Sequence, residues 1–373
     1  MKPHDNIISH NQNQNNELSI LFWNVLADVY LKYYDPKIKN IWDTYIEDLE
    51  IKPTEVNHIY RKERLLKNIQ KMNPDIIGLV EIQDNIYNYL RSKLKNYNFT
   101  EIISDNLDED KIKYGFPLEG KCIMYKKSLN IDVLNGGKCH VVDIGRDKRR
   151  KTLDFHFIYN NKECHYLVHH NSPVYMISVD KHGNYLNKED EKYEEIFHDK
   201  DTEPELNQII EIYKGVYKKF MRGNAVLCIK NLVDYIEENI TSNPDTILFI
   251  GGDFNSQPSY PKVQKSHVPE YIEKISRQMK DLHGYRNEKT FMSTRHDGRR
   301  LDYLFYDSTN VKAKYIHNIQ SPIYEETRID KKWSEEYIQI IKQVNKKKRI
   351  MNYSHQLMQY GSDHQPIFGK FIL

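Results

Sequence analysis

Residues Thr246 to Pro258 read TILFIGGDFNSQP. The apolar run from Ile247 to Ile250 is typical of a buried strand. Two glycines follow, and because neither carries a Cβ they let a backbone or a ligand approach closely. Asp253 and Asn255 come next, and side chains two residues apart lie on the same side of an extended segment. The stretch therefore predicts a carboxylate and a carboxamide that point together into one pocket at a sheet edge.

An Asx-rich turn after a core strand would look the same in the sequence, and such turns are common. Polar groups beside other predicted strands favour the pocket, since α/β folds build their sites at strand ends. Three predicted strands lead to such a group: strand 18–23 ends at Asn24, strand 75–80 ends at Glu81, and strand 174–179 leads toward His182. Asp302 lies within the predicted strand 301–306. Asp363 and His364 come just before the predicted strand 366–373.

Segments of helical periodicity alternate with these strands. Tyr60–Met72 places four apolar residues at helical spacing, and Pro74 follows it, so we expect an amphipathic helix that ends near Asn73. Residues 84–95 and 207–240 are also predicted to be helical. Strands that alternate with helices indicate an α/β fold.

The composition allows a large core, but the net charge does not indicate which kind of molecule the protein binds. With 373 residues, of which 39% are hydrophobic, the chain can bury a sizeable core in one large α/β domain or in two. The formal charge of +2, from 55 basic and 53 acidic residues, indicates no partner, so a basic groove would have to be local. Residues 1–17 are polar and predicted to be a disordered tail, whereas 184–205 and 321–350 are charged and predicted to be insertions.

The location of the protein also follows from what the sequence contains. No stretch approaches the ~20 apolar residues of a membrane span, and the N-terminus lacks the apolar segment of a secretory signal. The four cysteines show no CxxC spacing, which indicates reduced thiols rather than a disulfide framework or a zinc site. We expect an intracellular protein, cytoplasmic or nuclear, without a membrane partner.

Oxygen ligands dominate the predicted strand ends. Glu81, Asp363 and Asn24 form a set that suits Mg²⁺, with Mn²⁺ as the alternative, because Mg²⁺ binds through one or two carboxylates plus a substrate phosphate. A set of strand-end residues with few histidines and no clustered cysteines does not suit zinc. Each residue also has a purely structural interpretation: Asn24 would close a turn, Glu81 would form a surface ion pair, and Asp363 would cap a turn.

The remaining polar groups have the chemistry of phosphoester hydrolysis. Asp253 would orient or deprotonate an attacking water. His364 would act as an electrophile or acid if a second carboxylate holds its ring and raises its pKa. Asp302 is the candidate, because an aspartate among apolar strand residues is costly without a partner. Asn255 would donate to a phosphate oxygen, and the set indicates metal-assisted hydrolysis of a phosphodiester or phosphomonoester.

The order of these motifs resembles that of the endonuclease/exonuclease/phosphatase superfamily, which includes DNase-I-like nucleases, abasic-site endonucleases and inositol-polyphosphate phosphatases. The motifs are WNVLAD, DIIGLVEIQ, GKCIMYK, a middle histidine, GGDFN, LDYLFY and SDHQP. Residues 24–28 together with 119–126 look most like the branch that contains carbon-catabolite-repressor-type deadenylases, nocturnin and the angel proteins.

The resemblance spans roughly residues 18 to 373 and implies one catalytic domain over them. The fold that it implies is a four-layer α/β/β/α sandwich of two mixed sheets. It implies Mg²⁺ at Glu81, with Asn24 and Asp363 completing the shell around metal and phosphate. The other roles that it implies are water positioning by Asp253, phosphate contact by Asn255, and transition-state stabilisation by His364 paired to Asp302.

Three departures from the family pattern bear on the substrate. His182, which stands where the family has a histidine after a strand, lies in an Asp-Lys-His context rather than Asn-Thr-His. Val80 replaces a common glutamine beside Glu81. The aromatic and proline residues that form an adenine clamp in poly(A)-specific members are missing near 295–300 and after His182. Arg299 and Arg300 instead suggest phosphate contacts, or else a solvated hairpin.

We expect a Mg²⁺-dependent phosphodiesterase that acts on nucleic acid, with RNA degraded from its 3′ end as the leading hypothesis. Basic stretches at 146–151, 295–300 and 346–349 would bind the phosphate backbone, although such stretches are often plain solvated surface. One alternative keeps the chemistry and changes the substrate to a small phosphorylated metabolite, a nucleotide or abasic DNA. Another is a catalytically inactive binding module.

Overall fold

A computed structural model describes residues 16–27, 59–104, 119–144, 150–171, 175–179, 210–213, 216–221, 223–255, 272, 279–283, 300–316 and 333–373. The predicted insertion at 184–205 and tail residues 1–15 lie outside this set. The strand that follows the tail begins at Glu17, one residue earlier than predicted.

The first large sheet has the strand order β16-β17-β1-β2-β5-β3, with β4 paired to β5. β1 and β2 run parallel and their neighbours run antiparallel, so the sheet is mixed. The strands are β1 Glu17–Asn24, β2 Ile76–Ile82, β3 Tyr97–Phe99, β4 Ile103–Ser104, β5 Gly120–Lys126, β16 Lys312–Ile316 and β17 Ile367–Ile372.

The second large sheet has the order β14-β15-β13-β9-β8-β6, with β7 paired to β8, and only β9 and β13 are parallel. A small sheet, β10-β12-β11, stands apart from both. The strands are β6 Ile131–Val133, β7 His140–Asp143, β8 Lys151–Tyr159, β9 Lys162–His170, β10 Tyr175–Val179, β11 Ile210–Tyr213, β12 Val216–Met221, β13 Ile247–Asp253, β14 Met279–Asp281 and β15 Asp302–Asp307.

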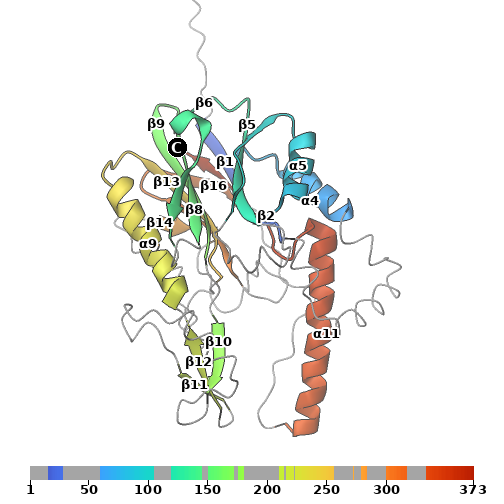
Figure 1. Ribbon diagram of the computed structural model, residues 1–373. Helices are drawn as coiled ribbons and strands as arrows, with labels where there is room; N and C mark the ends of the chain where they lie inside the picture. Colours follow the sequence, from blue (N-terminus) through green and yellow to red (C-terminus); the bar gives the residue numbers. More distant parts are fainter. Residues whose placement is uncertain are drawn as a thin grey trace, which may run out of the picture.

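The two large sheets pack face to face, because alternate residues on each present an apolar face. Phe22 of β1, Phe155 of β8 and Phe249 of β13 belong to the buried cluster between them. Helices α4 (Ile59–Met72) and α5 (Asp84–Lys93) cover the outer face of the first sheet, and α9 (Gly223–Asn239) covers that of the second (Figure 1). This arrangement confirms the predicted α/β/β/α sandwich of two mixed sheets.

The two glycines of the opening stretch serve sheet packing. β13 continues through both to Asp253. A Cβ on Gly251 would lie 2.7 Å from the Tyr166 hydroxyl and 2.8 Å from Phe22 Cβ, and one on Gly252 would meet the Phe254 ring at 2.7 Å. The expected close approach therefore exists, but it is made by core side chains of this protein.

Replacing Gly251 by alanine is expected to destabilise the protein by about 1–3 kcal/mol, since overpacking forces neighbours out of place. Urea unfolding measures the change. A double variant that adds Tyr166→Phe removes the hydroxyl closest to the new methyl group, so it should lose less stability than the two single variants summed. Simple additivity would contradict this explanation.

The prediction that 207–240 is helical, in one helix or two, is wrong at 210–213 and 216–221. Residues 210–213 and 216–221 form the antiparallel pair β11–β12, and α9 begins at Gly223. Ile210–Tyr213 and Val216–Met221 are rich in β-branched and aromatic residues and flank Lys214-Gly215, a composition that favours a hairpin.

The second charged segment, 321–350, was predicted to be helical in part, and the helix found there continues beyond it. Helix α11 spans Glu335–Tyr360, passing the predicted limit at residue 350 and ending just before the Ser-Asp-His motif. All four cysteines are free thiols. Within the described part of the chain, no helix has both the length and the apolar character that crossing a membrane requires.

Candidate active site

Strand ends from both large sheets meet at one end of the sandwich. Asn24 is the last residue of β1. The parallel strand β2 pairs with β1, and Asn24 lies opposite Val80, one residue before Glu81. In the second sheet, Asp253 of β13 lies opposite both His170 of β9 and Asp302 of β15. This register, rather than sequence proximity, brings the polar groups together.

Asn24 links the two sheets at this end. Its Nδ2 donates to Glu81 Oε1 at 2.7 Å and to Asp253 Oδ2 at 2.9 Å, while its Oδ1 accepts the Leu26 backbone N–H at 2.9 Å. The amide nitrogen therefore faces the carboxylates. Asn24 holds the two carboxylates in register, whereas the predicted role was that of an oxygen ligand.

Glu81 occupies a strained backbone position. Its φ is +56°, and the pairing of β2 with β5 shifts register between Val80 and Ile82, which marks a β-bulge. A non-glycine residue in the left-handed region costs free energy, of order 1–3 kcal/mol, and bulges re-aim side chains near functional sites. The bulge turns the Glu81 carboxylate toward Asn24, and its Oε2 accepts the Ala27 N–H at 3.2 Å.

The Ser-Asp-His motif is anchored to the end of β1. Ser362 Oγ donates to the Asn24 carbonyl at 2.8 Å, and the Trp23 indole N–H donates to the His364 carbonyl at 3.0 Å. Gly361, with φ +81°, permits the turn after α11, and Arg61 of α4 donates to its carbonyl at 3.2 Å. These contacts fix Asp363 and His364 beside Glu81 and Asp253.

His364 and Asp302 form the pair that the sequence predicts. His364 Nδ1 lies 2.7 Å from Asp302 Oδ2, and both side chains are buried. Burial lowers the pKa of His364, but the nearby carboxylates of Asp302, Asp363 and Asp253 outweigh it and raise this pKa to about 10. The imidazole is therefore cationic at neutral pH, with its Nε2 3.7 Å from Asp363 Oδ1.

The cluster of carboxylates fits a divalent cation. Burial raises the pKa of Glu81 to about 8, with further contributions from the charges of Glu119 and Asp363, against the opposing effects of His364 and the Asn24 hydrogen bond. Several buried acidic groups with few compensating cations are a donor set that suits a hard ion such as Mg²⁺. The residues present therefore fit the metal that the resemblance implies.

Asn255 lies at the same end but not in an extended segment. Its φ is +48°, so the alternation rule behind its predicted direction does not apply. Its backbone N–H donates to Asp253 Oδ1 at 2.8 Å, and its Nδ2 donates to the Asn171 carbonyl at 3.0 Å. The side chain thus ties β13 to the end of β9 and stays next to Asp253.

His170 is a site residue that sequence reasoning missed. Its Nε2 lies 3.7 Å from Glu81 Oε1 and 4.0 Å from Asp253 Oδ2, and the ring is buried. The histidine predicted here, His182, lies outside the described residues. The available signal was the run His169-His170-Asn171 at the end of an apolar strand, which has the same pattern as the other strand ends.

Of the two predicted phosphate-binding arginines, Arg299 lies outside the described residues. Arg300 is buried, its guanidinium pairs with Asp281, and its Cζ lies 4.6 Å from the centre of the Tyr303 ring. A buried arginine whose charge is already paired does not fit the predicted contact with substrate. Its position stabilises the start of β15, which carries Asp302.

Two packed mixed sheets with acidic groups and a histidine at one shared end define the DNase-I-like endonuclease/exonuclease/phosphatase fold, which the resemblance implied. Comparison with solved structures confirms this fold. ANGEL2, a 2′,3′-cyclic phosphatase, matches with a TM-score of 0.57 and 12% identity, covering 95% of each chain. The human nocturnin catalytic domain matches with a TM-score of 0.53 and 12% identity, covering 96% of this chain and 94% of nocturnin.

A third similar structure is TDP2 of D. rerio humanised by 14 mutations, with a TM-score of 0.50 and 13% identity over 95% of this chain and 99% of that one. No family model and no curated protein sequence matches this chain. At 12–13% identity, the likeness to these structures is one of backbone fold.

Proposed function

We propose that this protein is a Mg²⁺-dependent phosphodiesterase that hydrolyses nucleic acid, and that its substrate is RNA shortened from the 3′ end. The observation that carries the proposal is the convergence of Glu81, Asp253 and Asp363 with the His364–Asp302 pair. These groups come from distant parts of the chain and from both sheets, which also supports a single catalytic domain over residues 18–373.

Asp253 is the group that we assign to the attacking water. One of its oxygens accepts the Asn255 N–H and the other accepts the Asn24 amide, so the carboxylate is held in one orientation. A fixed and buried carboxylate orients a water molecule or removes its proton. Asn255 and His170, both beside Asp253, are assigned to the phosphate.

His364 is the group that we assign to the developing negative charge. Asp302 holds Nδ1, so the proton on Nε2 is the one available to a phosphoryl oxygen. A buried cationic donor that is already in position stabilises a transition state more than the ground state.

Glu81 and Asp363 are the residues that we assign to Mg²⁺, and Asn24 holds Glu81 in place. The bound cation would neutralise charge on the phosphoryl group and orient it. Because Asn24 of the first sheet holds Asp253 of the second, and Asp302 of the second sheet holds His364, the site depends on the packing of the whole sandwich.

The choice of nucleic acid rests on the fold and on local positive charge. Nocturnin and ANGEL2 share the fold, and Lys346–Arg349 lies on α11, which leads into the Ser-Asp-His motif. In Figure 1, α11 and the small sheet extend from the same end of the sandwich.

A second candidate is a phosphatase on a small or terminal phosphoester, favoured by the likeness to ANGEL2, a 2′,3′-cyclic phosphatase.

A gel assay with 5′-labelled substrates distinguishes these activities. The lanes contain poly(A), mixed-sequence RNA, the same RNA ending in a 2′,3′-cyclic phosphate, and duplex DNA with an abasic site, each with Mg²⁺ or EDTA. A Mg²⁺-dependent ladder that shortens from the 3′ end is the expected result. Loss of the cyclic phosphate without shortening would assign the phosphatase, and a single cut at the abasic site would assign a DNA endonuclease.

Mg²⁺ binding is expected to weaken as the pH falls below about 8, because the ion requires the Glu81 carboxylate and competes with its proton. Each pH unit below that value should cost about tenfold in apparent affinity. The rise in melting temperature with Mg²⁺ measures this at pH 6 and pH 8.5. Glu81→Gln should remove both the rise and its pH dependence; an unchanged rise in this variant would place the ion elsewhere.

A further inference from the structure

The β8–β9 hairpin brings two histidines opposite each other. A two-residue turn, Asn160-Asn161 with φ of +51° and +59°, joins the strands and pairs Tyr159 with Lys162. Such a turn fixes the register. His156 therefore pairs directly with His165, and Glu163 lies one diagonal step away on the same face.

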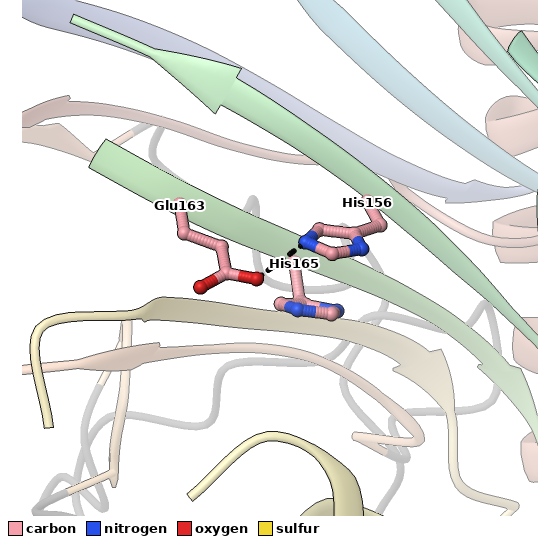
Figure 2. A group of neighbouring side chains, drawn as sticks. All are labelled: His156, Glu163 and His165. Carbon is pink, nitrogen blue, oxygen red and sulfur yellow. Dashed lines mark hydrogen bonds and ion pairs between the residues drawn. The ribbon is translucent and has the colours of Figure 1, made fainter. Parts of the chain in front are cut away.

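This face is the outer side of the second sheet. Phe155 and Cys164, the chain neighbours of these residues, point into the core between the sheets. Figure 2 shows the imidazoles of His156 and His165 one above the other, with the Glu163 carboxylate beside them. The ring centres are 4.0 Å apart, His156 Nε2 lies 2.7 Å from Glu163 Oε1, and one ligand atom of each of the three residues lies within 4.8 Å of the others.

Neighbouring side chains hold two of the three donors in place. His165 Nδ1 lies 2.9 Å from Asp154 Oδ1, and Asp154 Oδ2 accepts the Tyr235 hydroxyl of α9 at 2.7 Å. A carboxylate on one ring nitrogen fixes the ring and directs the other nitrogen toward a metal ion. The second oxygen of Glu163 accepts the Thr246 hydroxyl at 3.1 Å.

We propose that His156, Glu163 and His165 bind a transition-metal ion of the Zn²⁺ class, with a water molecule as fourth ligand. Two imidazoles and one carboxylate are a zinc donor set, whereas Mg²⁺ prefers oxygen ligands. Asp154 and Tyr235 connect the site to α9. The side chains of His156 and Glu163 are 21% and 39% exposed, so the ion enters from solvent.

This site is separate from the one assigned to Mg²⁺. His165 and His170 are five residues apart on β9, about 16 Å along the strand. They also face opposite sides of the sheet, because five is an odd number. The inference therefore does not depend on the proposed function.

Binding requires a small local rearrangement. A tetrahedral ion about 2.1 Å from each ligand separates the ligand atoms by about 3.4 Å. His156 Nε2 and Glu163 Oε1 must therefore move apart from 2.7 Å, and the stacked rings must turn about their Cβ–Cγ bonds. The ion takes the place of the hydrogen bond between His156 Nε2 and Glu163 Oε1.

Co²⁺, a spectroscopic substitute for Zn²⁺, tests the proposal on the full chain purified without a histidine tag and freed of metal with EDTA. With millimolar Mg²⁺ present, we expect one Co²⁺ ion with the visible absorption of a tetrahedral site, displaced by Zn²⁺. His156→Gln and His165→Gln should lower the Co²⁺ affinity at least ~100-fold, and Asp154→Asn about 10–100-fold.

Two controls separate this site from others. His140→Gln changes an exposed histidine that stacks on Tyr235 and is not a proposed ligand, so it should leave the spectrum unchanged. Glu81→Gln should also leave it unchanged. Circular dichroism checks that each variant folds, and His156→Gln at the exposed rim is the mildest change. Equal Co²⁺ affinity in wild type and folded His156→Gln, or no tetrahedral absorption in the wild type, would overturn the proposal.

Discussion

Asp253→Asn is expected to lower kcat for phosphoester hydrolysis on the order of 10²-fold or more. The substitution keeps the size of the side chain and removes the negative charge that orients or deprotonates water. KM should change little, because the carboxylate is assigned to the attacking water rather than to the ground-state substrate. Single-turnover kinetics at saturating Mg²⁺ measures the chemical step directly.

Asp307→Asn is the matched control. Asp307 is as deeply buried as Asp253. It is the last residue of β15, at the end opposite to Asp302, and it accepts the Thr309 N–H at 2.9 Å. It should lose some stability and keep its activity. Melting temperatures of both variants show whether a loss of activity reflects unfolding. Comparable kcat values for Asp253→Asn and wild type would remove Asp253 from the chemistry.

Asp302→Asn is expected to move the alkaline limit of activity to lower pH and to reduce kcat by about 10²-fold or more. The cationic form of His364 donates the proton, and this form exists below its pKa of about 10. Loss of the Asp302 charge lowers that pKa, so the cation disappears at a lower pH. Rate profiles of kcat against pH from 6 to 10 measure the shift.

Asp154→Asn is the control for the shift in the alkaline limit that is expected of Asp302→Asn. Asp154 also pairs with a buried histidine, His165, but on the outer face of the sheet. Its pH profile should match that of the wild type. An Asp302→Asn profile with an unmoved alkaline limit would mean that His364 does not supply the proton.

The sequence alone predicts most of the parts. The apolar runs of β1, β2, β13 and β15 are long enough to be recognised, and each places its polar group at or next to an end of the strand. The sequence also predicts the Asp302–His364 pair, because an aspartate among apolar strand residues is costly without a partner. The strand pair β11–β12 escaped prediction because both strands are short and come just before a helix, α9.

Tertiary structure decides how those parts are used. Whether Asn24 presents its oxygen or its nitrogen depends on the Leu26 N–H and on Asp253 of the other sheet. Gly251 faces Phe22 only because two sheets pack there, and Arg300 is paired internally only because β14 adjoins β15.

The choice among histidines shows the same division. The sequence pattern identified polar residues at strand ends, but it did not indicate that His170 belongs to the site. The position of His170 beside Glu81 and Asp253 depends on the β9–β13 register. The pairing of His156 with His165 depends likewise on a turn and a strand register. Periodicity and residue type are local properties that a sequence displays directly. Which side chains meet across two sheets depends on long-range packing, and only the folded chain determines it.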